Sequence, residues 1–122
     1  MSLKFQKHLE LRKGLISDGW RTPDTYCKQF ADIDAFPAVY LFLSTIDDAF
    51  EKSFVAYVGM STNLRQRMAG HEVLSDLAGR GYHSMRWFKR ISKADLRRVE
   101  ASYIQKFCPP WNISGKPRGV IQ

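Results

Sequence analysis

The chain has few cysteines. Of its 122 residues only Cys27 and Cys108 carry a thiol, and neither belongs to a CxxC pair. Zinc-binding and dithiol redox motifs commonly pair cysteines in this way, so the sequence favours neither chemistry. A disulfide between the two is left open, but a reduced, cytoplasmic protein is the simpler interpretation.

Other features are also missing. No apolar run approaches the roughly 20 residues needed to cross a membrane, and there is no repeat or low-complexity segment. The N-terminus mixes charged residues with scattered leucines, unlike a secretory signal. At 122 residues, 44% of them hydrophobic, the chain should fold as a single domain. It is too short for a catalytic domain plus a separate recognition domain.

Negative charge is scarce in the second half of the chain. Residues 1–59 hold 7 Lys/Arg and 8 Asp/Glu, whereas residues 60–122 hold 12 Lys/Arg and 4 Asp/Glu. The formal net charge of +7 therefore comes entirely from the second half. This predicts a polyanionic partner such as DNA or RNA. A solvated basic surface without a ligand is the alternative, and charge alone does not separate the two.

Hydrophobic patterning predicts the elements of an α+β fold. The uncharged, β-branched and aromatic runs at 38–43 and 54–59 are typical of buried strands. The short polar loop at 44–53 favours antiparallel pairing between them. A third strand is expected at 83–91. Helices are expected over about 3–16, over 23–33 after the capping sequence Thr22-Pro23-Asp24, over 63–74 after Ser61 or Thr62, and over 93–107 after a capping box at Ser92 and Asp95.

An acidic residue lies on the apolar side of the last predicted helix. At about 100° per residue, Glu100 falls within the arc that holds Leu96 and Tyr103. Burying a carboxylate is costly unless it is paired or binds a metal. Glu100 is therefore a candidate metal ligand. The alternative is a structural carboxylate satisfied by a buried arginine or by backbone donors.

The helix predicted over 63–74 shows the same anomaly. With Leu64 on its inward side, helical phase places Arg67 and His71 one turn apart on that side. Either residue alone suggests snorkelling or a structural ion pair. Together with Glu100, however, they form a complementary set. An arginine neutralises a phosphate, an imidazole moves a proton, and a carboxylate holds a divalent ion.

The order of these residues resembles the signature of the GIY-YIG nuclease family. The chain contains Ala38-Val39-Tyr40, Tyr57-Val58-Gly59, Asn63-Leu64, Arg67, His71, Glu100 and Asn112 in the family's order. The resemblance covers about residues 37–113. The unbroken stretch from Tyr57 to Arg67 makes it specific. Three features depart from the pattern: Ala38 replaces a glycine, the connection between the first two strands is long, and Met60 stands where some relatives have a lysine beside the phosphate.

This resemblance implies a catalytic domain, here residues 37–122, with a central three-stranded antiparallel sheet flanked by helices. Residues 1–36 have no counterpart in the pattern and are expected to form a helical extension packed on that domain. The implied activity is a divalent-metal-dependent endonuclease acting on phosphodiester bonds. DNA is the expected substrate, in DNA repair or recombination, and RNA is left open. The alternatives are a catalytically inactive nucleic-acid-binding module of the same fold and an unrelated basic interaction domain.

The resemblance also implies residue roles. Tyr40 and Tyr57 line the active site, Arg67 contacts the scissile phosphate, Glu100 ligates one Mg²⁺ or Mn²⁺, His71 assists, and Asn112 holds the site together. One tyrosine, driven toward phenolate by the metal and the arginine, would accept the proton of the attacking water. Tyr40 is favoured, because a tight turn is expected at Val58-Gly59 beside Tyr57.

Basic side chains in the second half are expected to contact the nucleic-acid backbone. The predicted contact residues are Arg65, Arg86, Lys89, Arg90, Lys93, Arg97 and Arg98. Because the chain has no room for a recognition domain, we expect recognition of nucleic-acid structure, weak sequence preference, or targeting by a protein partner.

Overall fold

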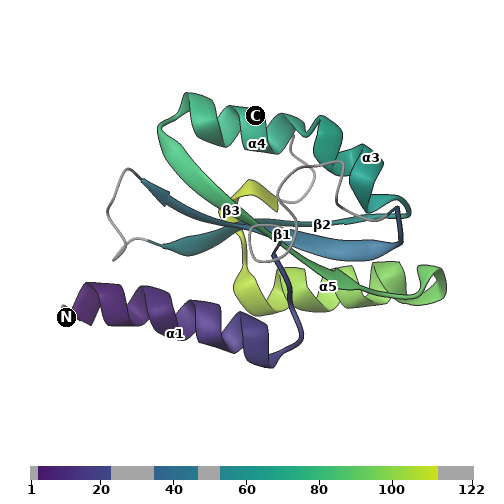
Figure 1. Ribbon diagram of the computed structural model, residues 1–122, viewed down its shortest axis with the longest axis horizontal. Coiled ribbons are helices and arrows are strands. Elements are labelled where there is room, and N and C mark those ends of the chain that lie inside the picture. The colour runs from purple at the N-terminus through teal and green to yellow at the C-terminus, as the bar shows by residue number, and fades with distance from the viewer. Residues whose placement is uncertain (1–2, 23–34, 47–52, 113–122) are drawn as a thin grey trace.

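Strand β1 (Ala38–Ile46) forms the centre of a three-stranded antiparallel sheet with the order β2-β1-β3 (Figure 1). Its neighbours are β2 (Phe54–Ser61) and β3 (Tyr82–Arg90). The computed structural model describes residues 3–22, 35–46 and 53–112. Uncharged, branched and aromatic residues suit a central strand that is buried on both faces. The predicted α+β fold with a small antiparallel sheet flanked by helices is therefore confirmed.

Helices cover both faces of the sheet (Figure 1). Alternate side chains of a strand point to opposite faces. Tyr40 and Phe42 therefore pack with α3 (Leu64–Ala69) and α4 (Glu72–Gly79). The intervening residues of β1 pack with α1 (Leu3–Ser17) and α5 (Leu96–Phe107). The two hydrophobic clusters are thus separated by the sheet itself.

β1 is longer than predicted. A polar loop was expected from residue 44, but β1 continues to Ile46. Ser44 is buried there, and its Oγ lies 2.7 Å from Oγ of Ser84 on β3. This cross-strand hydrogen bond satisfies both hydroxyls, so a polar residue is tolerated inside the sheet. The rest of the predicted loop, 47–52, lies outside the described residues.

The predicted helix over 63–74 is wrong as a single element. It consists of α3 and α4, separated by Gly70 and His71, which both have extended backbone angles. Glycine is a weak helix former, and the side chain of His71 caps the second helix. The N-cap of α3 is Asn63, which accepts a hydrogen bond from the Gln66 N–H, and not Ser61 or Thr62.

The last predicted helix begins with a 3-10 turn, η3 (Lys93–Asp95), and continues as α5. The capping box expected there does not form. Ser92 Oγ donates to Asp95 Oδ2 over 2.9 Å, and no side chain caps a backbone N–H. After α5 comes a second 3-10 turn, η4 (Pro110–Asn112). In the described part of the chain, no helix combines the length and the apolar character needed to cross a membrane.

The segment after α1 is tied to both the sheet and α5. Leu15, near the end of α1, and Trp20, just after that helix, are buried in the cluster on the α5 side. The backbone of Arg21 forms two hydrogen bonds with Phe88 of β3, of 2.8 and 2.7 Å. A helical N-terminal segment packed against the sheet was expected, and α1 has this position. The helix expected over 23–33 lies outside the described residues.

A polar network links this segment to α5. The Tyr103 hydroxyl donates to Asp18 Oδ2, and Lys89 Nζ lies 2.9 Å from that hydroxyl and 3.4 Å from Asp18 Oδ1. Burial raises the pKa of Asp18, but the hydrogen bonds from Tyr103 and Lys89 outweigh it, so the net pKa lies below its ordinary value. The Trp20 indole N–H also donates to Asp18. Asp18 therefore anchors the N-terminal segment to α5.

Tyr103→Phe should lower the free energy of unfolding by about 1–3 kcal/mol, because it removes two hydrogen bonds that each typically contribute about 0.5–1.5 kcal/mol. The phenylalanine ring keeps the stacking on Phe107 and the edge contact with Trp20, so the change isolates the hydroxyl. Denaturant-induced unfolding measures the difference. Tyr82→Phe is the matched control, because the Tyr82 hydroxyl has no hydrogen-bond partner among the described residues. Equal losses in the two variants would contradict the network's role.

Candidate active site

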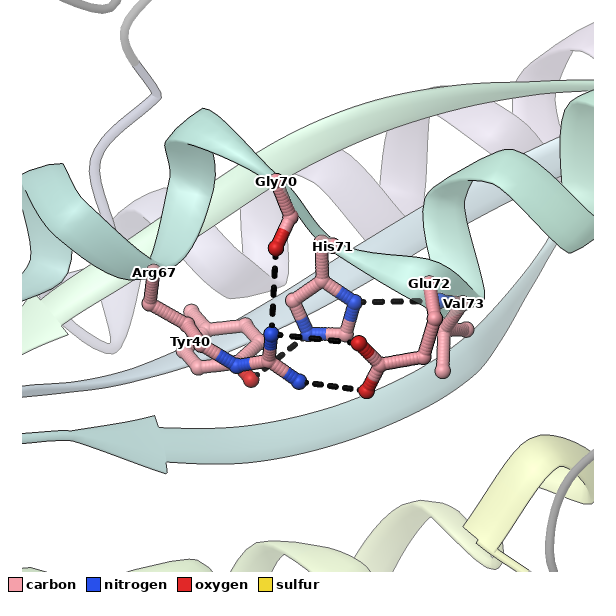
Figure 2. A network of polar contacts seen from close by, with 6 residues as sticks. All are labelled: Tyr40, Arg67, Gly70, His71, Glu72 and Val73. Carbon is pink, nitrogen blue, oxygen red and sulfur yellow. Dashed lines mark hydrogen bonds and ion pairs between the residues drawn. The ribbon is translucent and has the colours of Figure 1, made fainter.

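The candidate site forms around the hydroxyl of Tyr40. This side chain is only 2% exposed, beneath α3 and α4. Its Oη lies 2.7 Å from Nε2 of His71 (Figure 2). His71 is also buried, and its ring makes edge contacts with the rings of Tyr40, Phe42 and Tyr57. Two residues that lie 31 positions apart thus share a buried hydrogen bond.

The tautomer of His71 follows from its second hydrogen bond. The Val73 backbone N–H donates to His71 Nδ1 over 3.2 Å and thereby caps α4. Nδ1 accepts a hydrogen bond there, so it carries no proton of its own. The neutral ring then has its proton on Nε2. His71 Nε2–H therefore donates to the Tyr40 oxygen. Helix capping thus sets the direction of the hydrogen bond at the site.

Arg67 reaches the same place from the last turn of α3. Its Nη1 and Nη2 donate to the two carboxylate oxygens of Glu72, over 3.2 and 2.6 Å (Figure 2). Nη1 also donates to the Gly70 carbonyl over 3.2 Å. This pairing raises the pKa of Arg67 further and lowers the pKa of Glu72 to about 2. Arg67 also interacts with Tyr40, and its charge favours ionisation of that hydroxyl.

Burial is the largest influence on Tyr40. Desolvation raises its pKa above the ordinary value, the neighbouring Tyr57 raises it further, and Arg67 opposes both. The net pKa is raised, so in this arrangement Tyr40 is a neutral phenol at physiological pH. Two N–H-bearing groups, His71 and Arg67, face its oxygen. Both would stabilise a phenolate if the proton left.

Gly59 is needed for the two tyrosines to lie together. It pairs with Tyr40 across the sheet, and a Cβ atom at this position would lie 2.5 Å from Tyr40 Oη and 2.8 Å from Tyr57 Cε2. No side chain fits under these rings. The tight turn expected at Val58-Gly59 is wrong, since both residues belong to β2. The requirement for glycine here comes from close approach of side chains, not from a turn.

Asn112 closes the outer edge of β2. Its side-chain oxygen accepts from the Val58 N–H over 2.7 Å, and its side-chain nitrogen donates to the Val58 carbonyl over 2.8 Å. An edge strand leaves such groups unpaired, and the amide mimics the missing neighbour. Trp111 next to it donates to Asp76 of α4 over 2.9 Å. Asn112 therefore links the end of the described chain to the strand that carries Tyr57.

Glu100 lies apart from this group. It belongs to α5, which covers the sheet face opposite to the one that carries Tyr40 (Figure 1). It is half-buried, whereas a position central in a buried face was expected, and Leu96 is the buried residue of α5. Desolvation raises the pKa of its carboxyl, against a smaller lowering by Arg97. The structure does not bring Glu100 into the hydrogen-bonded group around Tyr40.

The chemistry of Glu100 is compatible with a divalent cation. Among the described residues, no three His, Cys, Asp or Glu side chains are grouped to hold a metal ion. Mg²⁺, however, keeps several water ligands and often takes one carboxylate plus oxygens of the substrate phosphate. A partly desolvated carboxylate offers such a ligand. The fit is therefore acceptable for a metal completed by substrate and water, and not for a preformed protein cage.

The predicted nucleic-acid-binding residues fall on both faces of the sheet. Arg86 pairs with Phe42 and Arg90 with Ala38, so both share the face of Tyr40. Lys89, between them, points to the other face, where its ammonium group binds Asp18 and Tyr103. The cluster expected from the sequence is therefore divided, because successive strand residues alternate.

The remaining basic residues of that set are exposed. Arg65 is on α3, Lys93 begins η3, and Arg97 and Arg98 lie in the first turn of α5. Arg98 pairs with Asp95 over 3.3 Å, in an exposed ion pair that salt would screen. Lys93, Arg97 and Arg98 are accessible to a polyanion on the surface around α5. Arg65 is exposed on the other side of the sheet, and Lys89 is engaged in the structural network.

Sequence reasoning missed Glu72. It lies five residues after Arg67, a spacing at which two side chains of one continuous helix do not face each other. The break at Gly70 and His71 turns the chain so that the two meet. No pattern in the sequence indicates this, because a helix over 63–74 was expected. Glu72 is thus part of the site through tertiary structure alone.

Replacing Arg67 should change the titration of Glu72. In the wild type, the Glu72 carboxyl should stay ionised down to a pKa of about 2. In Arg67→Gln, which lacks the cation, we expect the pKa to rise toward the ordinary value of 4.5. Any stabilisation from the pair is therefore complete above about pH 4.5 and is lost as pH falls toward 2. Carboxyl NMR titration measures both values.

Asp76 provides the internal reference for this titration. Its pKa is lowered by hydrogen bonds from Trp111 and Arg80, and neither of these groups changes in Arg67→Gln. A Glu72 pKa that stays near 2 in Arg67→Gln would show that Arg67 is not its main partner.

The chain was compared with known proteins. No family model matches it, and no curated protein or solved structure matches it either. Its function is therefore inferred from its residues and from their arrangement.

Proposed function

We propose that this chain is a divalent-metal-dependent endonuclease that hydrolyses phosphodiester bonds in nucleic acid, with DNA as the expected substrate. The observation that carries the proposal is the meeting of Tyr40, His71 and Arg67 in one buried, hydrogen-bonded group. These are residues at which the sequence resembles the GIY-YIG signature. The resemblance rests on the sequence alone and the contacts on the structure, so the two observations support each other.

Tyr40 is the proposed general base, and its surroundings explain how it would work. A phenol is a poor base until it loses its proton, and burial opposes that loss. The His71 Nε2–H and the Arg67 guanidinium both face the oxygen and would stabilise the phenolate. His71 cannot take the proton at Nε2, because the cap of α4 keeps that nitrogen protonated. We therefore assign His71 to support of the Tyr40 phenolate.

Arg67 is the proposed stabiliser of the phosphate. Negative charge builds up on the non-bridging oxygens as the phosphodiester is attacked, and a fixed guanidinium stabilises it. The planar fork of arginine matches two phosphate oxygens at once. The Gly70 carbonyl holds Nη1, so the orientation of the fork is set by the backbone between α3 and α4.

The proposed metal is Mg²⁺ or Mn²⁺, held by Glu100. A cation bound there would supply positive charge to polarise the phosphate and stabilise the leaving oxygen. A hard carboxylate oxygen suits these ions better than softer metals. Glu100 lies across the sheet from Tyr40 and Arg67, so this assignment rests on the resemblance and on the chemistry of the carboxylate, and the hydrogen-bonded group around Tyr40 does not add to it.

One alternative is supported by specific observations. A catalytically inactive nucleic-acid-binding module would keep the fold and the basic surface around α5. Two observations favour this alternative. The raised pKa of Tyr40 leaves it a neutral phenol that cannot act as a base, and the pairing with Glu72 compensates the charge of Arg67. Targeting by a protein partner in an intracellular setting is proposed in either case. A cleavage assay on duplex, nicked, branched and single-stranded substrates decides between the two functions.

Removal of the metal ligand should abolish cutting. Glu100→Gln keeps the size of the side chain but loses the charge, so cleavage with Mg²⁺ or Mn²⁺ should fall to background while nucleic-acid binding stays within about twofold. A cleavage assay and fluorescence anisotropy measure the two properties. Glu10→Gln, a change to an exposed residue of α1, is the charge-matched control. Wild-type cleavage in excess chelator would be incompatible with the metal assignment.

Arg67→Lys should lose most of the rate although it keeps the charge. Lysine lacks the planar fork, and removal of a preorganised electrostatic group typically reduces turnover by about 10²–10³. Single-turnover cleavage measures the loss, and thermal melting verifies the fold. Arg67→Ala should also remain folded, because Glu72 is largely exposed and the buried Tyr40 hydroxyl keeps its hydrogen bond with His71. Wild-type rates in Arg67→Lys, or unfolding of Arg67→Ala, would make Arg67 a structural residue.

A further inference from the structure

The carboxylate of Glu72 occupies the anion-binding side of Arg67. Its two oxygens accept from Nη1 and Nη2, over 3.2 and 2.6 Å (Figure 2). This two-point contact is the geometry that arginine also uses for phosphate. A phosphodiester that would accept hydrogen bonds from Nη1 and Nη2 of Arg67 therefore finds both donors already hydrogen-bonded to Glu72.

The ion pair also compensates the positive charge of Arg67, which would otherwise attract a phosphate. One guanidinium and one carboxylate in contact sum to zero, so a phosphate that approaches the intact pair is attracted little. The proposed role of Arg67, stabilisation of growing negative charge, requires an uncompensated cation. Within the described residues, the charge of Arg67 is matched by Glu72 and by no other ion pair.

Of the two partners, Glu72 is the one that can leave. The Arg67 side chain is 29% exposed, and Gly70 and Tyr40 hold it from two further sides. The Glu72 side chain is 62% exposed. Ion pairs this exposed contribute little free energy, because water replaces either partner. Separating the ion pair therefore costs little free energy, and Glu72 is the side chain that moves outward.

We propose that Glu72 is an internal competitor of the substrate phosphate for Arg67. In the free protein it holds the guanidinium in place beside Tyr40. A phosphodiester then displaces the carboxylate and takes over its two hydrogen bonds. This inference rests on the proposed function, because it uses Arg67 as the phosphate-binding residue, but its test involves no cleavage.

The test uses dimethyl phosphate, the smallest phosphodiester, which is too short to reach the basic surface around α5 at the same time. It is titrated in chelator and monitored by NMR at Arg67 Nε–H and at the Gly70 amide. Glu72→Gln keeps the length of the side chain but removes the competing charge. We expect its dissociation constant to be about two- to fivefold lower than that of the wild type, the range that an exposed ion pair accounts for.

Two controls separate competition from a general effect of charge. Glu10→Gln removes the same charge from the exposed surface of α1 and should leave the dissociation constant unchanged. In an Arg67→Gln background, Glu72→Gln should give no gain at the Gly70 amide. Thermal melting verifies that each variant is folded.

Unchanged or weaker binding in Glu72→Gln would overturn the proposal and make Glu72 a positioning residue for Arg67. An equal gain in Glu10→Gln, or no response of Arg67 to the phosphodiester in any variant, would overturn it as well. Tighter binding by a protein that cuts no substrate would uphold the proposal and refute the nuclease function. Cleavage by the wild type without tighter binding of dimethyl phosphate by Glu72→Gln would refute the proposal and uphold the nuclease function.

Discussion

The hydroxyl of Tyr40 lies in the interior of the domain, and a buried hydroxyl without a partner costs about 1–3 kcal/mol. His71 satisfies it over 2.7 Å. For the imidazole to reach this depth, the chain must leave the helix between α3 and α4 and return toward the sheet. Gly59 has to lack a side chain so that the tyrosine rings can lie across β2. The local architecture on this face thus follows from one buried polar group.

The same break gathers the charged residues. His71 uses Nδ1 to begin α4 and Nε2 to bind Tyr40. Because α3 ends just before it and α4 begins just after it, Arg67 and Glu72 come from two helix ends that face each other. Fold stability and the chemistry of the site therefore depend on a single residue. Substitutions at His71 would affect both, which makes Arg67 and Glu72 the better probes of function.

The opposite face of the sheet contributes the candidate metal ligand. Glu100 lies on α5, and Tyr103, one turn further along, is anchored by Asp18 and Lys89. The segment that follows α1 thereby restrains the helix that carries Glu100. The positive charge of Lys89 is balanced by Asp18, while Lys93, Arg97 and Arg98 remain on the surface. One set of basic residues thus divides between a structural network and a surface suited to a polyanion.

Much of the fold could be predicted from the sequence by itself. Uncharged β-branched and aromatic runs determined β1 and β2, and the periodicity of Leu96 and Tyr103 determined α5, because burial of apolar groups acts locally along the chain. Helical phase also singled out Arg67 and His71 as chemically unusual, and the resemblance added Tyr40. Tertiary structure alone decided the break at Gly70, the tautomer of His71, the pairing of Arg67 with Glu72 and the sheet face of Lys89. These features depend on hydrogen bonds and ion pairs between elements. Such contacts produce no periodic pattern of residues from which they could be predicted.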